Sequence, residues 1–547
     1  AQAIFASDSG CRRFPPLAAL RRPPFRLQML LGKTASTNDT ELLVSAEPDP
    51  RLGQIVGEIA RTAVPNILGY GLTLVNELTN TVILGRTGDP AALAAMGLSN
   101  LMLNCLANTI GIGMAGALDT LVSQAHGAGQ QDIASHHFQR CRVLVALQML
   151  WMVPVLYFSD DILIGIGQDA EVAARAGEYI RASLWGLFAF FQYEATRKYL
   201  QNREDAIFPA IICAVGATMH VGWCWFFVIG LGLGNAGAGY ANCVTWWTQC
   251  AMATLYLACS AKNAGLRVRS VVWVEAPGMS NWGDYMRLAI PATLQLCSEA
   301  WFWEICVLVV GYLGKVALAA HVTTLNWVTL STTASLGINA STATLVGTAL
   351  GANLPRKAKA TAWMCMCTNM CIWSGLAFVM VYDREALSEF YSSDVYVQRL
   401  MQQLLPIFAV VGFCDSMQTA LSGALRGIGR HSVAAATYLL AYYGVMLPGG
   451  IVAAFNMEMG IHGVWGSFGA GTGLAAIVFV VLLLQVDYPQ VAAETSARIE
   501  LESMAASECG SPSVSRVQSC DLKAARRAME EGMEDAPEFE LQDDNLA

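Results

Sequence analysis

Two carboxylates within one apolar stretch are the residues of this sequence best suited to chemistry. Glu299 and Glu304 lie near the middle of residues 288–313, which read LAIPATLQLCSEAWFWEICVLVVGYL. A run of about 20 apolar residues is long enough to cross a bilayer. An ionisable residue at the bilayer centre costs roughly 2.5–3.5 kcal/mol on insertion scales, so it normally faces a cavity and serves a function. The pair therefore indicates a site that exchanges a proton for a cation.

The aromatic side chains between the two acids offer a second kind of cation contact. Trp301 and Trp303 flank Phe302, and the face of an indole ring attracts a cation. Successive residues of a helix point about 100° apart, so at least one of these rings faces lipid or the protein core. Glu299 and Glu304 are themselves about 140° apart around a helix, and they share a cavity wall only loosely.

The composition excludes a soluble protein. Hydrophobic residues make up 54% of the 547 residues and charged residues only 14%, whereas soluble domains carry about 25% charged residues. The formal net charge of −9 resides in the last 61 residues, which hold 14 acidic and 5 basic side chains. Such an acidic, serine-containing segment indicates a solvated and disordered tail. The remainder is an electrically balanced, apolar membrane protein.

No motif of an enzyme or of a nucleic-acid-binding protein is present. The pattern G-x-G-x-x-G occurs at residues 232–237, but it joins two apolar runs, and no acid follows about 20 positions later as a dinucleotide site requires. The closest cluster among the sixteen cysteines is Cys365, Cys367 and Cys371, with no histidine beside it. We expect the cysteines to pack within helices and the protein to need no metal or cofactor.

Apolar runs of membrane-spanning character follow one another after Arg51. The twelve runs cover residues 61–85, 91–118, 142–158, 182–200, 207–231, 236–260, 286–313, 316–347, 360–382, 399–424, 432–455 and 461–486. Thirteen lysines and arginines lie in the loops after even-numbered runs and six in those after odd-numbered runs. Because cytoplasmic loops are enriched in these cations, both termini should be cytoplasmic. The sequence predicts an all-α, multi-pass protein of the plasma membrane or of a vacuole or other organelle.

The runs divide the chain into five parts. We predict a disordered cytoplasmic arm, an N-terminal lobe of six helices, a cytoplasmic linker, a C-terminal lobe of six helices and the acidic, disordered cytoplasmic tail. Their respective bounds are 1–50, 51–260, 261–283, 284–487 and 488–547. The arm contains five arginines and several prolines, so a targeting peptide is the alternative interpretation of that segment.

An internal repeat relates the two lobes. Four landmarks recur after 224 to 226 positions: residues 61–65 at 287–291, 85–88 at 311–314, 120–128 at 344–352, and Asp169 with Leu200 at Asp394 with Leu425. Landmarks in constant register indicate a duplicated six-helix unit. Because six is even, both copies insert the same way up, which makes the repeats parallel. Transporters built in this way bind substrate between the halves, whereas a receptor or a membrane enzyme does not need the duplication.

Further acids lie in other apolar runs. The repeat offset of 226 places Glu304 of the seventh run at position 78 of the first run, next to Glu77. Asp415 is in the tenth run. An acid within a membrane span is a candidate functional residue by default. Glu194 in the fourth run has Arg197 and Lys198 one turn away, so we expect an ion pair within that helix instead.

Several motifs together resemble those of eukaryotic multidrug and toxic compound extrusion (MATE) transporters. The segment Ala117-Leu-Asp-Thr-Leu-Val-Ser-Gln-Ala-His-Gly-Ala128 is similar to the signature ALDTL-x-x-QA-x-GA of that family. Leu296-Cys-Ser-Glu299 and Trp303-Glu304 resemble its C-L-E-W-W-x-x-E stretch, with Ala300 in place of the first Trp. Leu421-Ser-Gly-x-Leu-Arg-Gly-x-Gly429 is similar to its S-G-x-L-R-G-x-G element. Other matches extend the resemblance in order from about Gly85 to Arg498.

The resemblance implies a V-shaped transporter of two six-helix lobes. It also implies roles for individual residues: Glu299, Glu304 and Asp415 as proton- or cation-coupling acids, and Asp119 as a signature residue that caps a helix at the cytoplasmic end. We expect the other signature positions, Gln124, Gly127, Gly423, Arg426 and Gly427, to be structural. The candidate lining of the substrate cavity is Glu77, Trp301, Trp303, Gln418 and Tyr443.

The sequence therefore predicts a monomeric antiporter in the lipid bilayer that exports organic cations or other small toxic metabolites in exchange for protons. Ionised acids would attract a cationic substrate, and protonation would release it after the lobes have rocked. Sodium coupling, with Glu299 and Asp415 as oxygen ligands, is one alternative. A flippase for lipids or lipid-linked molecules on the same two-lobe architecture is another.

Overall fold

The computed structural model describes residues 47, 50–263, 282–392 and 394–510. Residues 48–509 form one compact unit, and the second unit consists of residues 1–47 and 510–547, nearly all of which lie outside the described residues. Most of the predicted arm and most of the predicted linker therefore also lie outside them.

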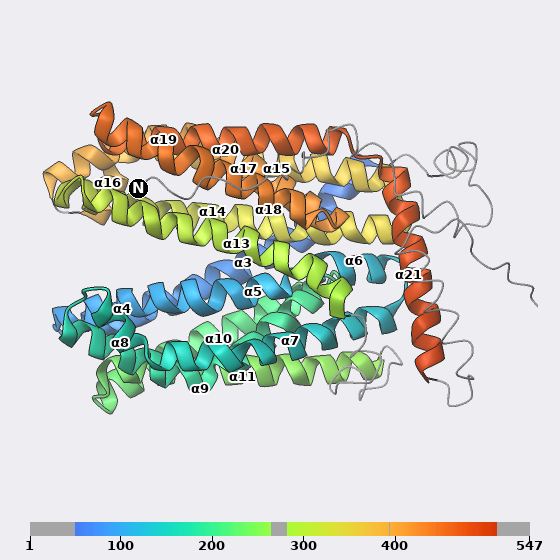
Figure 1. Cartoon of the computed structure of the whole chain (residues 1–547), viewed down its shortest axis with the longest axis horizontal. Helices are drawn as coiled ribbons and strands as arrows, with labels where there is room; N and C mark the ends of the chain where they lie inside the picture. Colours follow the sequence, from blue (N-terminus) through green and yellow to red (C-terminus); the bar gives the residue numbers. More distant parts are fainter. Residues whose placement is uncertain (1–46, 48–49, 264–281, 393, 511–547) are drawn as a thin grey trace, which may run out of the picture. The chain divides into compact units, whose positions relative to one another are not determined.

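The helices of the first unit fall into two similar series (Figure 1). The first series is α3 (Leu52–Gly85), α4 (Pro90–Leu103), η2 (Asn104–Asn108), α5 (Thr109–Ala115), α6 (Leu118–Gly127), α7 (Gln131–Tyr157), α8 (Ser159–Gly165), α9 (Ala170–Gln201), α10 (Ile207–Trp225), η3 (Phe226–Gly230) and α11 (Gly234–Asn263). The second is α13 (Trp282–Gly311), α14 (Lys315–Gly351), α15 (Pro355–Tyr382), α16 (Arg384–Tyr391), α17 (Val395–Ile428), α18 (His431–Leu439), η5 (Leu440–Met446), α19 (Leu447–Ile451), η6 (Val452–Asn456) and α20 (Ile461–Leu484). The η segments are π-helical and interrupt otherwise continuous rods. Counted as rods within the described residues, each series supplies six long helices, in agreement with the predicted twelve.

Hydropathy alone does not identify every one of these rods. Within the described part of the chain, nine helices are long and apolar enough to cross a membrane, and α9, α11 and α14 are not among them. The reason is visible in α9, where Glu194, Arg197 and Lys198 are all buried inside the protein. A helix that is surrounded by other helices can carry polar groups that bond to its neighbours instead of meeting lipid.

Repeated aspartates define where corresponding helices begin. Asp169 accepts hydrogen bonds from the backbone N–H groups of Glu171 and Val172 at the start of α9. Asp394 does the same for Tyr396 and Val397 at the start of α17. Satisfying these free donors stabilises a helix N-terminus by roughly 1 kcal/mol. The repeat landmark at these two positions is therefore an N-cap that both halves retain.

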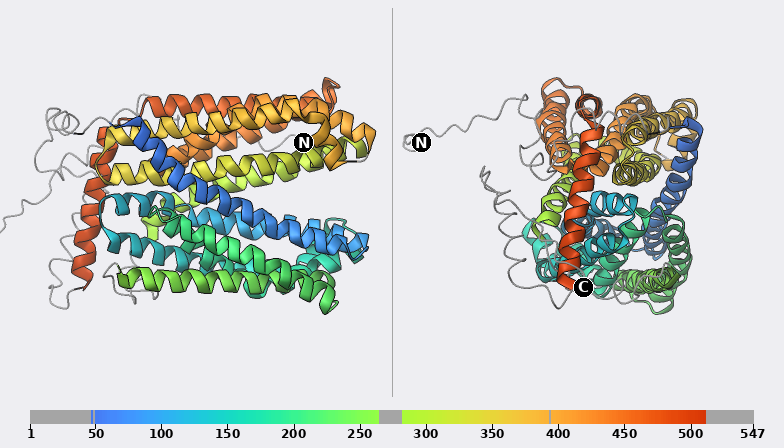
Figure 2. Two further views of the ribbon diagram at one scale, coloured as in Figure 1. Left: turned by 180° about the vertical axis from the view of Figure 1, so that it is seen from behind. Right: turned by 90° about the vertical axis from the view of Figure 1, so that its right-hand side faces the viewer.

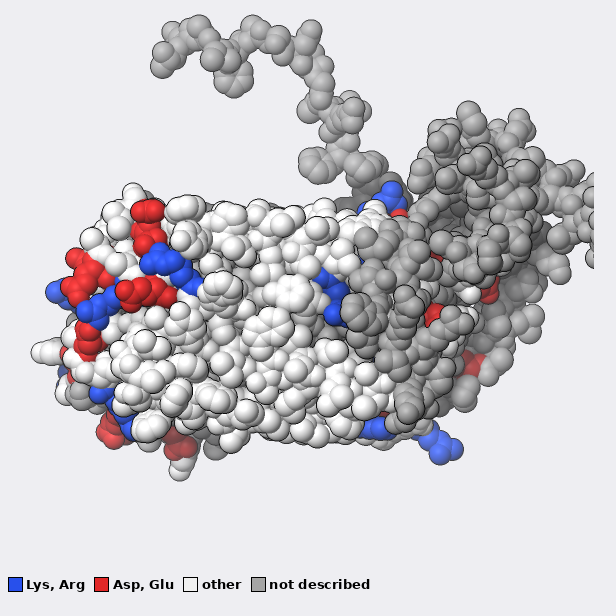
Figure 3. Space-filling view, turned by 90° about the horizontal axis from the view of Figure 1, so that it is seen from below, with Lys and Arg blue, Asp and Glu red and all other residues white. Residues whose placement is uncertain are grey.

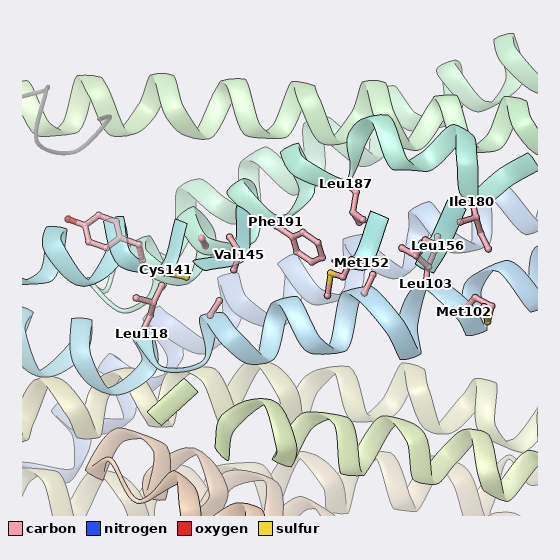
Figure 4. Packing of buried hydrophobic residues seen from close by; sticks show 14 of the residues in the cluster. Met102, Leu103, Leu118, Cys141, Val145, Met152, Leu156, Ile180, Leu187 and Phe191 are labelled. Atoms are coloured by element: carbon pink, nitrogen blue, oxygen red, sulfur yellow. The ribbon is translucent and has the colours of Figure 1, made fainter. Parts of the chain in front are cut away.

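Each series packs around its own apolar core, which defines an N-lobe (α4 to α11) and a C-lobe (α14 to α20). In the N-lobe, Met152, Leu156, Leu187 and Phe191 are almost completely buried, and Figure 4 shows side chains from facing helices meeting there. On the face shown in Figure 3, charged side chains gather toward the two ends, with a broad uncharged band between them. This pattern fits a protein that spans a bilayer.

The first helix of each repeat crosses between the lobes. Ile55 and Ile59 at the beginning of α3 pack with Ile338 and Leu345 of α14 in the C-lobe, and Figure 2 shows α3 running diagonally from one group of helices to the other. Conversely, Tyr285 at the beginning of α13 belongs to the N-lobe core and donates a hydrogen bond to the carbonyl of Met114 over 2.9 Å. The two lobes are thus interlocked by exchanged helix ends.

The lobes meet backbone to backbone where α6 of the N-lobe crosses α14 of the C-lobe. A Cβ atom on Gly127 would lie 2.0 Å from the carbonyl oxygen of Thr348, and one on Gly351 would lie 2.0 Å from that of Gln124. Only glycine fits such an approach. Gly127 and Gly351 are equivalent positions of the repeat, so the duplicated motif at 120–128 and 344–352 encodes this crossing. We call the end of the molecule that contains this crossing the closed end.

The prediction of a disordered tail from residue 488 is wrong for its first part, because Tyr488–Gly510 form a helix, α21. The mean acidity of the tail concealed apolar residues at helical spacing: Tyr488, Val491, Ala492 and Ile499 are all buried. Residues 511–547 of the predicted tail lie outside the described residues. In Figure 1, α21 lies across the ends of the other helices.

Candidate functional site

Glu299 of α13 and Asp415 of α17 form an acidic pair in the C-lobe. Asp415 is 9% exposed, Glu299 is half-buried, and the two carboxylates lie within range of mutual repulsion. The guanidinium of Arg426, further along α17, also lies within electrostatic range of Glu299. The structure therefore brings together two acids that are more than 100 positions apart in the sequence.

A hydrogen-bonded chain extends from this pair. The side-chain amide of Gln418 donates to Asp415 Oδ1 over 2.9 Å and to the hydroxyl oxygen of Tyr442 over 3.2 Å. Because Tyr442 accepts this bond, its own hydroxyl proton remains available as a donor. Phe302 packs against the ring of Tyr442 in a tilted arrangement, with 4.9 Å between the ring centroids. Tyr442 was not predicted from the sequence, since a tyrosine in an apolar run resembles ordinary core.

The π-helical segment η5 supports this arrangement. It carries Tyr442, which reaches Gln418, and Tyr443, whose hydroxyl donates to the carbonyl of Ser298 on α13 over 3.1 Å. Wider π turns often occur at functional sites in helices. Gln418 is 1% exposed, so this predicted cavity residue lies inside the C-lobe next to the acids.

Glu304 lies in different surroundings from Glu299. It is within electrostatic range of Cys105, in the segment η2 of the N-lobe. Trp301 donates from Nε1 to the carbonyl of the same Cys105 over 3.2 Å. One acid of α13 therefore faces the interior of the C-lobe, and the other faces the seam with the N-lobe.

The aromatic residues of α13 also point in different directions. Trp301 is 41% exposed and Phe302 is 2% exposed. Trp303 is half-buried and packs on Phe468 of α20, with 4.7 Å between ring centroids. Of the three rings, Trp301 is the one that lies at the seam, where a cation could meet its face.

A second polar cluster lies in the N-lobe and was not predicted. His220 Nε2 lies 3.0 Å from Asn80 Oδ1, Asn80 donates to Asn242 over 3.1 Å, and Asn242 donates to the hydroxyl of Tyr179 over 2.6 Å. Glu77 is exposed and lies within electrostatic range of Tyr179. The sequence signal that could have identified the cluster is the recurrence of amide and imidazole side chains within apolar runs.

Asp119 is the centre of an ion cluster at the closed end. Its carboxylate accepts from Lys198 Nζ at 2.9 and 3.0 Å and from Asn202 at 3.0 Å, and it pairs with Arg426 of the C-lobe at 3.1 Å. Of the two cations that we expected beside Glu194, Arg197 does pair with it at 2.5 Å, whereas Lys198 pairs with Asp119. The signature acid is therefore part of an ion pair between the lobes.

The remaining signature residues surround the same end. Gln124 donates to the carbonyl of Gly427 over 2.8 Å, across the lobe boundary. A Cβ atom on Gly423 would lie 2.4 Å from the carbonyl oxygen of Asn339, and one on Gly427 would lie 2.7 Å from that of Ala343. These contacts bring α17 close to α14 within the C-lobe.

The acidic pair can hold a proton or a cation. Two ionised carboxylates in one buried site repel each other, so a single positive charge shared between them is favourable. Among the described residues, no group of three or more His, Cys, Asp or Glu side chains has the arrangement of a metal site.

The profile of the MatE family matches the sequence twice, at residues 65–226 and 291–452. The chain belongs to the MatE family. The two matches are offset by 226 positions, which agrees with the internal repeat. As a MATE transporter of the eukaryotic type, it is an integral, multi-pass membrane transporter of small molecules rather than an enzyme.

Similar proteins come from plants and animals. The chain is 28% identical to Protein DETOXIFICATION 32 of Arabidopsis thaliana, over 77% of this chain and 81% of the relative. It is 28% identical to Multidrug and toxin extrusion protein 1 of Xenopus tropicalis, over 85% and 84%. The structure superposes on the eukaryotic MATE transporter AtDTX14 with a TM-score of 0.77 and 23% identity, covering 82% of this chain and 99% of that one. These comparisons confirm the predicted twelve-helix, two-lobe fold and the predicted role as a membrane transporter.

Proposed function

We propose that this MATE transporter is a proton-coupled antiporter that exports organic cations by alternating access. The observation that carries the proposal is the placement of Glu299 and Asp415 together inside the C-lobe, within range of mutual repulsion. A titratable pair of this kind binds a proton in one step of a cycle and offers negative charge in another. The relatives named for multidrug and toxin extrusion support an organic substrate.

In the proposed cycle, the two acids alternate between protonated and ionised forms. With the cavity facing the cytoplasm, ionised Glu299 attracts the cationic substrate. After the lobes have rocked outward, a proton neutralises the pair and the substrate leaves. The ligand shifts the equilibrium between the two conformations only through its different affinity for each. Exchange therefore follows from charge alone, without further chemistry.

Gln418 and Tyr442 keep the pair in position during this exchange. Gln418 holds one carboxylate oxygen of Asp415 and, through its second amide proton, the oxygen of Tyr442. The hydroxyl proton of Tyr442 can then turn toward an ionised carboxylate. These bonds stabilise the ionised state when no substrate is bound, and so prevent an empty transporter from retaining a proton permanently.

Flux through purified protein in proteoliposomes tests the proposal. An imposed pH gradient should drive a fluorescent organic cation across the membrane. Glu299→Gln and Asp415→Asn should each reduce the pH-driven flux at least about tenfold, because each removes one titratable group of the pair. Glu178→Gln alters an exposed acid of α9 and should leave the flux unchanged. Equal flux through Glu299→Gln and wild-type protein would refute the assignment.

Two further conditions in the same assay separate the alternatives. Flux that requires a sodium gradient and does not respond to pH would establish sodium coupling in place of proton coupling. Transfer of headgroup-labelled lipids between leaflets, with no flux of the organic cation, would establish a flippase. Proton coupling predicts full flux in sodium-free buffer and no lipid transfer.

A further inference from the structure

The N-terminal half of α21 is anchored in the C-lobe. It follows α20 after three residues, and Tyr488, Val491 and Ala492 belong to the C-lobe core. Their side chains are 2%, 7% and 0% exposed. A covalent connection and a shared apolar core therefore join this half of the helix to the C-lobe.

The other half of α21 is attached to the N-lobe. Ile499 is 4% exposed and belongs to the N-lobe core. Glu502 Oε2 lies 2.9 Å from His137 Nε2 of α7, within hydrogen-bond distance. Burial alone would raise the pKa of Glu502, but His137, Arg498 and Arg140 hold it at about 2. The carboxylate is thus ionised and paired on the N-lobe side.

The same helix also contacts the residues that join the lobes. Arg498 donates from Nη2 to Gln124 Oε1 over 2.5 Å, and the amide nitrogen of Gln124 donates to Gly427 of the C-lobe. Gln124 lies on α6 at the crossing with α14. Tyr488 and Ile499 are eleven positions apart, so α21 spans about 16 Å between the two cores.

We propose that α21 is a strap that holds the closed end shut, and that its N-lobe attachments must break each time this end opens. The inference rests on the alternating access of the proposed function. Opening must carry α6 away from α17, and α21 cannot follow both lobes. It is released from the N-lobe because, among the described side chains of α21, one residue of the N-lobe core and a few polar contacts hold it there. The C-lobe, in contrast, holds the helix by a shared core and by the covalent chain.

Measuring the distance between the lobes at the closed end tests whether α21 holds that end shut. Spin labels introduced through unnatural amino acids at Gln130 and Ala352, which are exposed on the N-lobe and C-lobe sides, report it in lipid nanodiscs. The release variant is Ile499→Ala with Glu502→Gln. Its matched control, Leu501→Ala with Glu500→Gln, makes the same chemical changes at exposed positions of α21.

The release variant should increase the long-distance population at least about tenfold over wild type, because truncation of one buried isoleucine alone shifts a two-state equilibrium by more than that. The control should match wild type. Identical distance distributions in all three proteins would overturn the strap. If the double variant does not fold, the single variants Glu502→Gln and Glu500→Gln give the same comparison with a smaller expected shift. Equal distance distributions for these two single variants would also overturn the strap. Wild-type flux in the same preparation tests the proposed function separately.

Discussion

At the scale of single residues, the two acids of α13 should have separable functions. Glu299 lies beside Asp415, whereas Glu304 faces Cys105 at the lobe seam. Glu304→Gln should therefore raise the KM for an organic cation about tenfold while a pH gradient still drives flux, since it removes a charge from the substrate side alone. Concentration dependence of pH-driven flux in proteoliposomes measures this. A complete loss of pH coupling in Glu304→Gln would show that both acids carry the proton.

Asp119 should matter more for stability than any surface acid. Replacing it with Asn leaves Lys198 and Arg426 beside a neutral group in a buried site. Removing one partner of a buried ion pair destabilises a protein by about 3–5 kcal/mol. Thermal unfolding in detergent should show a much lower midpoint for Asp119→Asn. Glu171→Gln breaks an exposed pair with Arg175 and should have little effect; equal midpoints for the two variants would contradict the cluster's role.

Single residues also show where sequence reasoning reached its limit. The apolar length of residues 286–313 correctly predicted a helix around Glu299. The predicted ion pair of Glu194 with Arg197 is also confirmed. The partner of Glu299 was not predictable in the same way, because the direction of a side chain in a bundle depends on which helices surround it. Lys198 illustrates this: Glu194 is one turn away, yet it binds Asp119, which is 79 positions distant.

At the scale of helices, the crossing of α6 and α14 depends on glycine in both copies. Gly351→Ala would place a methyl group against a backbone carbonyl that has no room to move. Overpacking of this kind typically costs about 1–3 kcal/mol, and here it would also force the lobes apart. We expect reduced thermal stability and reduced flux.

Gly375→Ala on α15 provides the matched control, because a Cβ atom there meets nothing within 4 Å. It should keep wild-type stability and flux. If Gly351→Ala behaved like Gly375→Ala in both measurements, the close contact between α6 and α14 would be refuted.

The predicted bounds were close for α11 and α14, whereas the predicted runs 142–158 and 182–200 begin eleven and twelve residues after the starts of α7 and α9. The polar rod α9 could still be found from the repeat, because its equivalent α17 is apolar enough to recognise. The helix α21 was missed because composition averaged over residues 488–547 hides a short apolar face. The structure is needed to show that the apolar face of α21 packs against the cores of both lobes.

At the scale of the whole molecule, the exchanged ends of α3 and α13 should make the lobes mutually dependent. Ile55 and Ile59 are buried in the C-lobe, and Tyr285 is buried in the N-lobe. If the chain is divided between residues 270 and 271, the two halves should copurify through a tag on one of them. Expressed separately, each half should aggregate, since its crossing helix would expose apolar surface. A monodisperse, thermally stable N-terminal half on its own would contradict this interlocking.

The π-helical segments also bear on the ancestry of the molecule. The segment η3 covers Phe226–Gly230 and η6 covers Val452–Asn456, 226 positions apart, which is the spacing of the two family matches. A π turn differs from an α turn by one additional residue, so chance would rarely produce it twice in the same register. The simplest history places this insertion in the ancestral six-helix gene, before duplication. By contrast, the π segment η5 beside Tyr442 has no counterpart in α10, so the two copies differ at the segment that supports the acidic pair of the C-lobe.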